Sequence, residues 1–214
     1  MNLQHSLPSL LTLVNALTGF ACVCQLARGG SIETAAWLLV GAWILDMLDG
    51  PLARYLGVES RFGAALDSLA DLVSFGVAPA LFVARHSEPA ALIYLAAVLL
   101  RLARFQVGAP GDHLVFQGLP SPAAAMLIAG WFLVFPELPV VVVSILLSFV
   151  MLSKIGYPDL PKHYLKGIRS RAELLLPLML LIALGPARAL LATFSCYCLL
   201  APWLSGQVGK TRKV

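Results

Sequence analysis

Apolar runs about as long as a membrane-crossing helix follow one another along this chain, separated by short polar or proline-containing segments. A helix needs about 20 mostly apolar residues to cross a bilayer, whose core admits only structures that satisfy their own backbone hydrogen bonds. Charged residues make up 12% of the chain, about half the share in soluble domains. The sequence therefore predicts an all-α fold, a polytopic membrane helical bundle in a single domain, residues 1–214. About eight transmembrane helices are expected, at residues 8–27, 34–50, 65–84, 89–106, 121–135, 138–153, 172–185 and 188–204.

Basic residues are distributed unevenly among the segments between these expected helices. With the N-terminus placed in the cytoplasm, 12 lysines and arginines fall in inner segments and 3 in outer ones. An excess of this kind marks the cytoplasmic side of membrane proteins. We therefore expect a multi-pass protein of the cell (inner) membrane with both termini in the cytoplasm. The net charge of +4 does not indicate a nucleic-acid partner, because no helix face combines basic with aromatic residues.

Four of the 11 acidic residues gather within or beside the second and third expected helices. A carboxylate inside a bilayer costs a few kcal/mol or more, and it persists there only with a partner or a function. Asp46 and Asp49 are three residues apart, and Asp67 and Asp71 are four apart, so each pair shares one helix face. If the two helices run antiparallel, all four carboxylates can converge at the cytoplasmic end of the helix pair.

A cluster of four carboxylates repels itself unless cations neutralise it. Oxygen ligands fit Mg²⁺ or Mn²⁺, whereas zinc is a poor match without histidine or cysteine at this spacing. Two such ions about 3.5–4 Å apart would clamp a phosphoryl group undergoing displacement. One alternative is a set of buried ion pairs with nearby arginines. Another is a cation transporter, which would spread its acidic residues through the depth of the membrane.

The residues from Asp46 to Asp71 spell D-x2-D-G-x2-A-R-x8-G-x3-D-x3-D, which resembles the signature of the CDP-alcohol phosphatidyltransferase family at every fixed position. The resemblance implies a six-helix core, followed here by two C-terminal helices. It also implies a reaction in which an alcohol attacks the β-phosphate of a CDP-linked lipid and CMP leaves. By the same resemblance Asp46, Asp49, Asp67 and Asp71 are ligands of two Mg²⁺ or Mn²⁺ ions, and Asp71 is also the general base.

A nucleotide pocket beside the metal ions is a further implication of the resemblance. Small residues in the motif would let a ligand approach the backbone closely. Thr12 and Asn15 share a face of the first expected helix, and they can meet the nucleotide or hydrogen bond to a neighbouring helix. The candidate nucleotide-binding residues are Thr12, Asn15, Gly50, Ala53, Arg54, Gly63 and Ser68.

Three further segments, residues 66–81, 101–107 and 116–125, are similar to the serine-using branch of the family, the membrane-integral phosphatidylserine synthases. This similarity implies transfer of a phosphatidyl group from CDP-diacylglycerol to L-serine, by a homodimer among membrane lipids. Arg101 and Arg104 are candidates to bind the serine carboxylate or a phosphate.

One position departs from the serine-using pattern within the second of these segments. Gln106 stands where the branch usually has Asn. The departure leaves open another acceptor, such as glycerol phosphate or inositol phosphate, and an archaeal-type ether-lipid donor. It does not touch the four aspartates, so the expected chemistry is unchanged.

Overall fold

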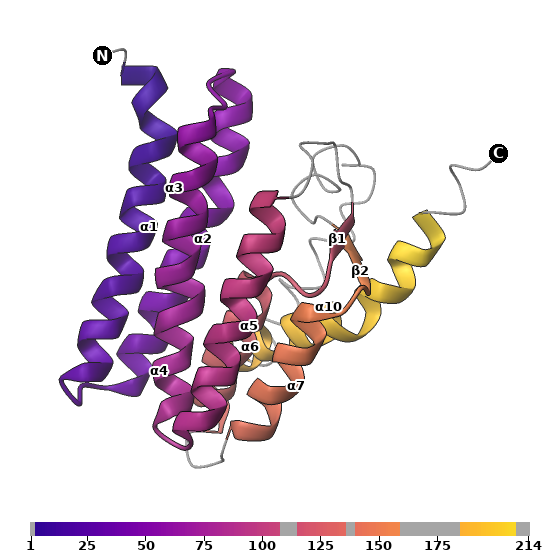
Figure 1. Ribbon diagram of the computed structural model, residues 1–214. Coiled ribbons are helices and arrows are strands. Elements are labelled where there is room, and N and C mark those ends of the chain that lie inside the picture. The colour runs from indigo at the N-terminus through magenta and orange to yellow at the C-terminus, as the bar shows by residue number, and fades with distance from the viewer. Residues whose placement is uncertain (1–2, 108–114, 136–139, 159–184, 209–214) are drawn as a thin grey trace.

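The computed structural model describes residues 3–107, 115–135, 140–158 and 185–208, which form helices and one small pair of strands (Figure 1). The predicted helical fold is confirmed for these residues. The helices are α1 (Leu3–Ala27), α2 (Ile32–Leu56), α3 (Arg61–Asp71), the π-helix η1 (Leu72–Val77), α4 (Ala78–Ala84), α5 (Glu88–Val107), α6 (Ser121–Val134), α7 (Val141–Leu152) and α10 (Pro186–Val208). The strands are β1 (Val115–Gln117) and β2 (Gly156–Pro158).

Four helical segments in the described part of the chain are long and apolar enough to cross a membrane: Ser6–Ala27, Ile32–Leu56, Arg61–Ala84 and Glu88–Val107. The protein is therefore a helical membrane protein. The helices α6, α7 and α10 match three more expected spans in position, but their apolar segments are shorter. The span expected at 172–185 lies outside the described residues except for Gly185. The count of eight crossings thus stays a prediction.

Both helices that carry the aspartates extend further than their sequence patterns predict. α2 was expected to end at residue 50, but it continues through Pro51 to Leu56, where Gly57 ends it in a left-handed conformation with φ 64°. α3 begins at Arg61 instead of residue 65, and the Ser60 side chain caps it by accepting the Gly63 N–H at 3.0 Å. Asp49 and Asp67, which were expected near the ends of their helices, consequently lie further inside helical backbone, where neighbouring turns fix their directions.

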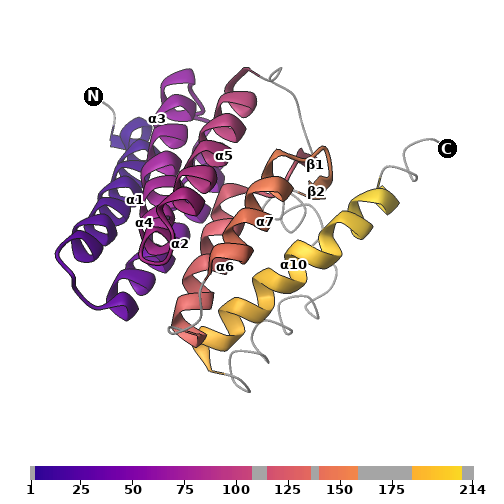
Figure 2. The same cartoon turned by 60° about the horizontal axis from the view of Figure 1, so that its bottom comes forward.

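The helices pack into a bundle in which α1 lies against α2 and against the continuous rod formed by α3, η1 and α4 (Figures 1 and 2). α5 packs on the rod through η1 and α4, while α6 contacts α2 and α10. Gly19 lets α1 approach the rod closely, because a Cβ at this position would lie 2.7 Å from Cα of Ser74. This close contact holds the rod against the N-terminal helices.

A short strand pair fastens the C-terminal helix to the rest of the described structure. β1 runs antiparallel to β2, with Phe116 opposite Tyr157. Gly118 follows β1 with φ 79°, and its N–H donates to the Ile155 carbonyl at 2.8 Å. The Tyr157 hydroxyl donates to the Cys198 carbonyl of α10 at 3.1 Å. The strand pair therefore links α10 to the segments on either side of α6 and α7.

Candidate active site

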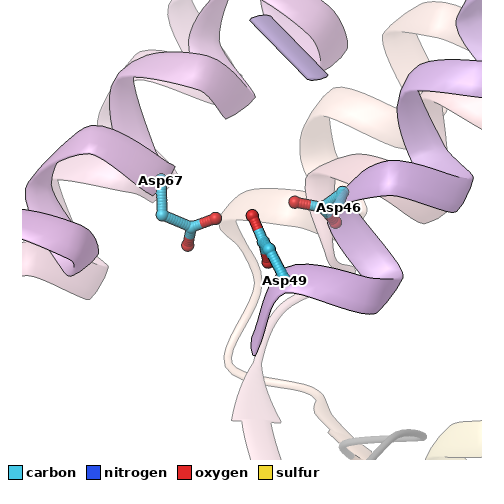
Figure 3. Close-up of side chains that lie close together, drawn as sticks. All are labelled: Asp46, Asp49 and Asp67. Carbon is cyan, nitrogen blue, oxygen red and sulfur yellow. The ribbon is translucent and has the colours of Figure 1, made fainter. Parts of the chain in front are cut away.

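Three carboxylates meet between α2 and α3, as Figure 3 shows. Asp46 and Asp49 come from adjacent turns of α2, and Asp67 faces them from α3. One oxygen from each side chain lies within 4.8 Å of the others. Carboxylates this close repel one another, so the arrangement calls for a cation between them. The helix pair thus brings together three of the four acids predicted to converge.

Asp71 lies one turn beyond Asp67, beside this group of three, and its carboxyl contacts that of Asp46. Its Oδ1 is buried and has no hydrogen-bond partner among the residues that the structure describes. Buried polar atoms nearly always have a partner, so an orphaned oxygen beside a carboxylate cluster marks a place for a ligand. Asp71 can therefore face either a cation or a polar group of a substrate.

The donor set of the cluster fits a hard divalent cation. Every group that Asp46, Asp49, Asp67 and Asp71 offer is a carboxylate oxygen, the ligand type that Mg²⁺ and Mn²⁺ prefer. The spacing of the three clustered oxygens and the unpaired oxygen of Asp71 both agree with this assignment. The residues present can hold the metal that the sequence led us to expect.

Helix α1 contributes a direct contact to the cluster. The Thr12 hydroxyl lies 2.6 Å from Oδ2 of Asp49, and both residues are buried. Asn15, one turn along α1, is fully buried, and within the described part of the chain neither polar atom of its side-chain amide has a partner. Its backbone carbonyl accepts a hydrogen bond from the Ser74 hydroxyl at 3.1 Å. Of the two α1 candidates, Thr12 therefore orients a carboxylate, while the Asn15 amide is free to bind a ligand.

The other nucleotide-binding candidates surround the cluster on α2 and α3. A Cβ on Gly50 would meet only the Arg54 guanidinium, at 3.6 Å, so space remains beside this glycine. Arg54 itself is exposed. Ser68 accepts a hydrogen bond from the side-chain amide of Gln106, which also donates to the Ala64 carbonyl at 3.1 Å. The two remaining candidates, Ala53 and Gly63, are partly buried on α2 and α3.

The two candidate acceptor-binding arginines differ in their surroundings, although they share helix α5. Arg101 is buried: one terminal NH₂ group donates to the Ser121 hydroxyl at 2.8 Å, and its Nε–H has no partner in the described ranges. Asp71 is among its charged neighbours. Arg104 is exposed and donates to the Leu152 carbonyl at 3.2 Å. Arg101 is therefore the one placed next to the acidic cluster.

Sequence reasoning assigned no role in the site to two side chains that support it. Ser121, at the start of α6, fixes Arg101, and Gln106, at the end of α5, ties that helix to the turns around Asp67. Ser121 lies in a segment that was noted only for its family resemblance. Gln106 was noted as a departure from the serine-using pattern. Neither contact could be found from helical spacing, because each joins segments that are distant in the sequence.

Comparison with known proteins finds a family match over the region that contains the four aspartates. The family model described as CDP-alcohol phosphatidyltransferase matches residues 5–156. The archaetidylserine synthase of Methanothermobacter thermautotrophicus is 36% identical over 166 residues, covering 72% of this chain and 70% of that protein. The CDP-diacylglycerol–serine O-phosphatidyltransferase of Methanocaldococcus jannaschii is 37% identical over 158 residues, covering 71% and 73%. Its namesake in Bacillus subtilis is 31% identical over 175 residues, covering 78% and 98%.

Proposed function

Because the chain belongs to the CDP-alcohol phosphatidyltransferase family, we propose that it transfers a phosphatidyl group from CDP-diacylglycerol to L-serine and releases CMP. The similar proteins of Methanocaldococcus jannaschii and Bacillus subtilis carry the name of this activity. The observation that carries the proposal is the convergence of Asp46, Asp49 and Asp67 next to the orphaned oxygen of Asp71. Together they form an acidic site beside a candidate base.

We assign the metal to Asp46, Asp49 and Asp67, with Asp71 as a further ligand. Two Mg²⁺ or Mn²⁺ ions held there would neutralise the charge on the diphosphate and on the departing CMP. Thr12 holds Asp49 in its orientation through the 2.6 Å hydrogen bond. We assign Gly50, Ala53 and Gly63 to the nucleotide pocket, where space beside Gly50 lets a ligand approach α2, and the unpaired amide of Asn15 can hydrogen bond to the nucleotide.

We assign the role of general base to Asp71. A serine hydroxyl is a weak nucleophile, so its proton must be taken as the oxygen attacks the β-phosphate. The buried, unpartnered Oδ1 of Asp71 can accept that proton. Arg101, whose Nε–H is free and which lies near Asp71, can hold the carboxylate of serine. The attacking oxygen would then stay beside the base.

The placement in the membrane follows from the charge distribution along the chain. The excess of lysine and arginine on one side predicts that the aspartates face the cytoplasm, where serine is available. The diacylglycerol tails would remain in the bilayer beside the helices. We expect a multi-pass protein of the cell membrane that works as a homodimer.

The test is an assay of the purified protein with CDP-diacylglycerol and a panel of acceptors: L-serine, glycerol phosphate and inositol phosphate. We expect CMP release with L-serine only, abolished by a chelator and restored by Mn²⁺ or Mg²⁺. Asp67→Asn should be inactive, and Glu88→Gln, which removes an acidic charge at the start of α5, should be active. CMP release that requires a phosphorylated acceptor, or that persists without divalent ions, would contradict the proposal.

An ether-linked donor is the second candidate, because one similar protein is named archaetidylserine synthase. The aspartates would act in the same way on either lipid, since the reacting diphosphate is common to both. Running the assay with both CDP-diacylglycerol and CDP-archaeol distinguishes the two donors. A kcat/KM at least tenfold higher with one of them would identify the preferred lipid.

A further inference from the structure

The helix that carries Asp67 and Asp71 changes its hydrogen-bond pattern directly after Asp71. In an α-helix the N–H of residue 79 would donate to the carbonyl of Phe75. Residue 79 is proline, which has no N–H and whose ring clashes with the carbonyl four residues earlier. The helix opens at this point into η1, and the Ala78 N–H donates to the carbonyl of Val73, five residues back. Pro79 thus supplies a sequence reason for the π-helix.

Tyr94 of α5 supplies the donor that Pro79 lacks. Its hydroxyl donates to the Phe75 carbonyl at 2.9 Å, and both residues are fully buried. A buried carbonyl without a partner is costly, so this hydroxyl stabilises the opened turn. The π-helix is also held by α1, because the Ser74 hydroxyl donates to the Asn15 carbonyl. The π-helix is therefore fixed by contacts to two neighbouring helices.

The register of η1 decides where the carboxylates point. A π-helical turn holds about one residue more than an α-helical turn. One extra residue rotates the side chains before it by about 100° relative to those after it. Beyond η1, α4 buries Phe82 and Val83 in the core. Before it, α3 presents Asp67 to the acids of α2 (Figure 3). With α4 packed as it is, an uninterrupted α-helix would turn Asp67 and Asp71 away from α2.

We propose that Pro79 and Tyr94 together set the register of η1 and thereby aim Asp67 and Asp71 at the acidic cluster. Tyr94 is then a positioning residue: it touches no reacting group and acts through the backbone of the helix that carries the aspartates. The inference rests on the proposed function, because it concerns the same metal site. It adds two residues, Pro79 and Tyr94, that lie outside the aspartate motif.

The first test compares Tyr94→Phe with Tyr157→Phe. Each variant removes one hydroxyl from a buried tyrosine that donates to a backbone carbonyl, but the Tyr157 hydroxyl contacts α10. We expect Tyr94→Phe to weaken Mn²⁺ binding, measured by electron paramagnetic resonance, by about tenfold. This is the size of effect expected when one buried carbonyl loses its hydrogen-bond donor. Tyr157→Phe should leave Mn²⁺ binding unchanged. Equal Mn²⁺ affinities in the two variants would overturn the inference.

The second test restores the missing N–H with Pro79→Ala. An alanine at this position can donate to the Phe75 carbonyl in a regular α-helix, so the melting temperature should be unchanged or higher. Mn²⁺ binding and CMP release should nevertheless fall at least about tenfold, because the carboxylates turn away. Adding Tyr94→Phe to Pro79→Ala should then lower Mn²⁺ binding and CMP release little further. A Pro79→Ala variant that keeps wild-type Mn²⁺ affinity would exclude the proposed role of the register.

The readout separates this inference from the proposed function. Mn²⁺ binding at the site is the share of the total bound Mn²⁺ that is lost in Asp67→Asn. It is measured without CDP-lipid. Wild-type protein that binds Mn²⁺ but releases no CMP would count against the proposed function, while the variants would still test the register. Wild-type protein without Asp67-dependent Mn²⁺ binding would overturn both, because no metal site would remain to be positioned.

Discussion

The Thr12 hydroxyl lies 2.6 Å from Oδ2 of Asp49, so the first helix is hydrogen bonded directly to the acidic cluster. The same hydroxyl is 3.0 Å from the Pro8 carbonyl on its own helix. Because Thr12 and Asp49 are both buried, water does not compete for this contact. The carboxylate of Asp49 therefore has a fixed orientation that depends on a residue outside the aspartate motif.

Replacing Thr12 with valine keeps the shape of the side chain and removes its hydroxyl. A hydrogen bond to a charged group contributes about 1.5–3 kcal/mol, so we expect a loss of about tenfold or more in kcat/KM for the lipid donor. The metal concentration for half-maximal activity should rise as well. The control is Thr18→Val on the same helix, where the hydroxyl donates to the Val14 carbonyl at 2.7 Å. Similar activity losses in both variants would show that the effect belongs to the helix and not to Asp49.

Asp71→Asn tests the assignment of the base. Asparagine has nearly the same size but cannot take the proton of the serine hydroxyl, so turnover should be lost while nucleotide affinity is largely retained. Asp67→Asn should instead weaken Mn²⁺ and nucleotide binding, because Asp67 belongs to the group of three clustered oxygens. CMP release and calorimetric binding of CDP distinguish the two effects. Unchanged turnover in Asp71→Asn would refute its role as the base.

The two arginines of α5 should respond differently to substitution by lysine. Lysine at position 101 keeps the charge but loses the forked geometry in which one NH₂ group reaches Ser121 while Nε–H stays available to a ligand. We expect Arg101→Lys to raise the KM for serine by at least about tenfold. Arg104→Lys, at an exposed position, should change it less. Steady-state kinetics with serine and lipid donor varied separately measure this difference, which a larger effect of Arg104→Lys would contradict.

The shared helix face of each aspartate pair could be predicted from the sequence, because it depends only on the geometry of a single helix. Residues three or four apart share a face whatever the rest of the chain does. The bond from Thr12 to Asp49 and the burial of Arg101 could not be predicted, since both depend on which helices become neighbours. The end of α2 was placed too early, at residue 50, because the apolar run ends there, whereas the helix continues through Pro51 to Leu56.

Gly118→Ala tests the turn that leads into α6 and so to Ser121. This glycine has φ 79°, and a Cβ would lie 2.0 Å from the Met151 carbonyl oxygen, so both strain and a clash oppose alanine. Positive φ costs about 1–2 kcal/mol and overpacking about 1–3 kcal/mol more. Gly29→Ala is the matched control, because Gly29 has φ 70° with open space around it.

We expect Gly29→Ala to lower the melting temperature by about 2–8 °C and Gly118→Ala by at least about twice as much as Gly29→Ala, since 1 kcal/mol corresponds to about 2–4 °C at this chain length. The melting temperatures are measured in detergent by the intrinsic fluorescence of tryptophan. Gly118→Ala should also raise the KM for serine, because displacing the start of α6 moves the hydroxyl that holds Arg101. Equal melting temperatures for the two variants would mean that the chain relieves the contact with Met151 by a small shift, and then the KM should also be unchanged.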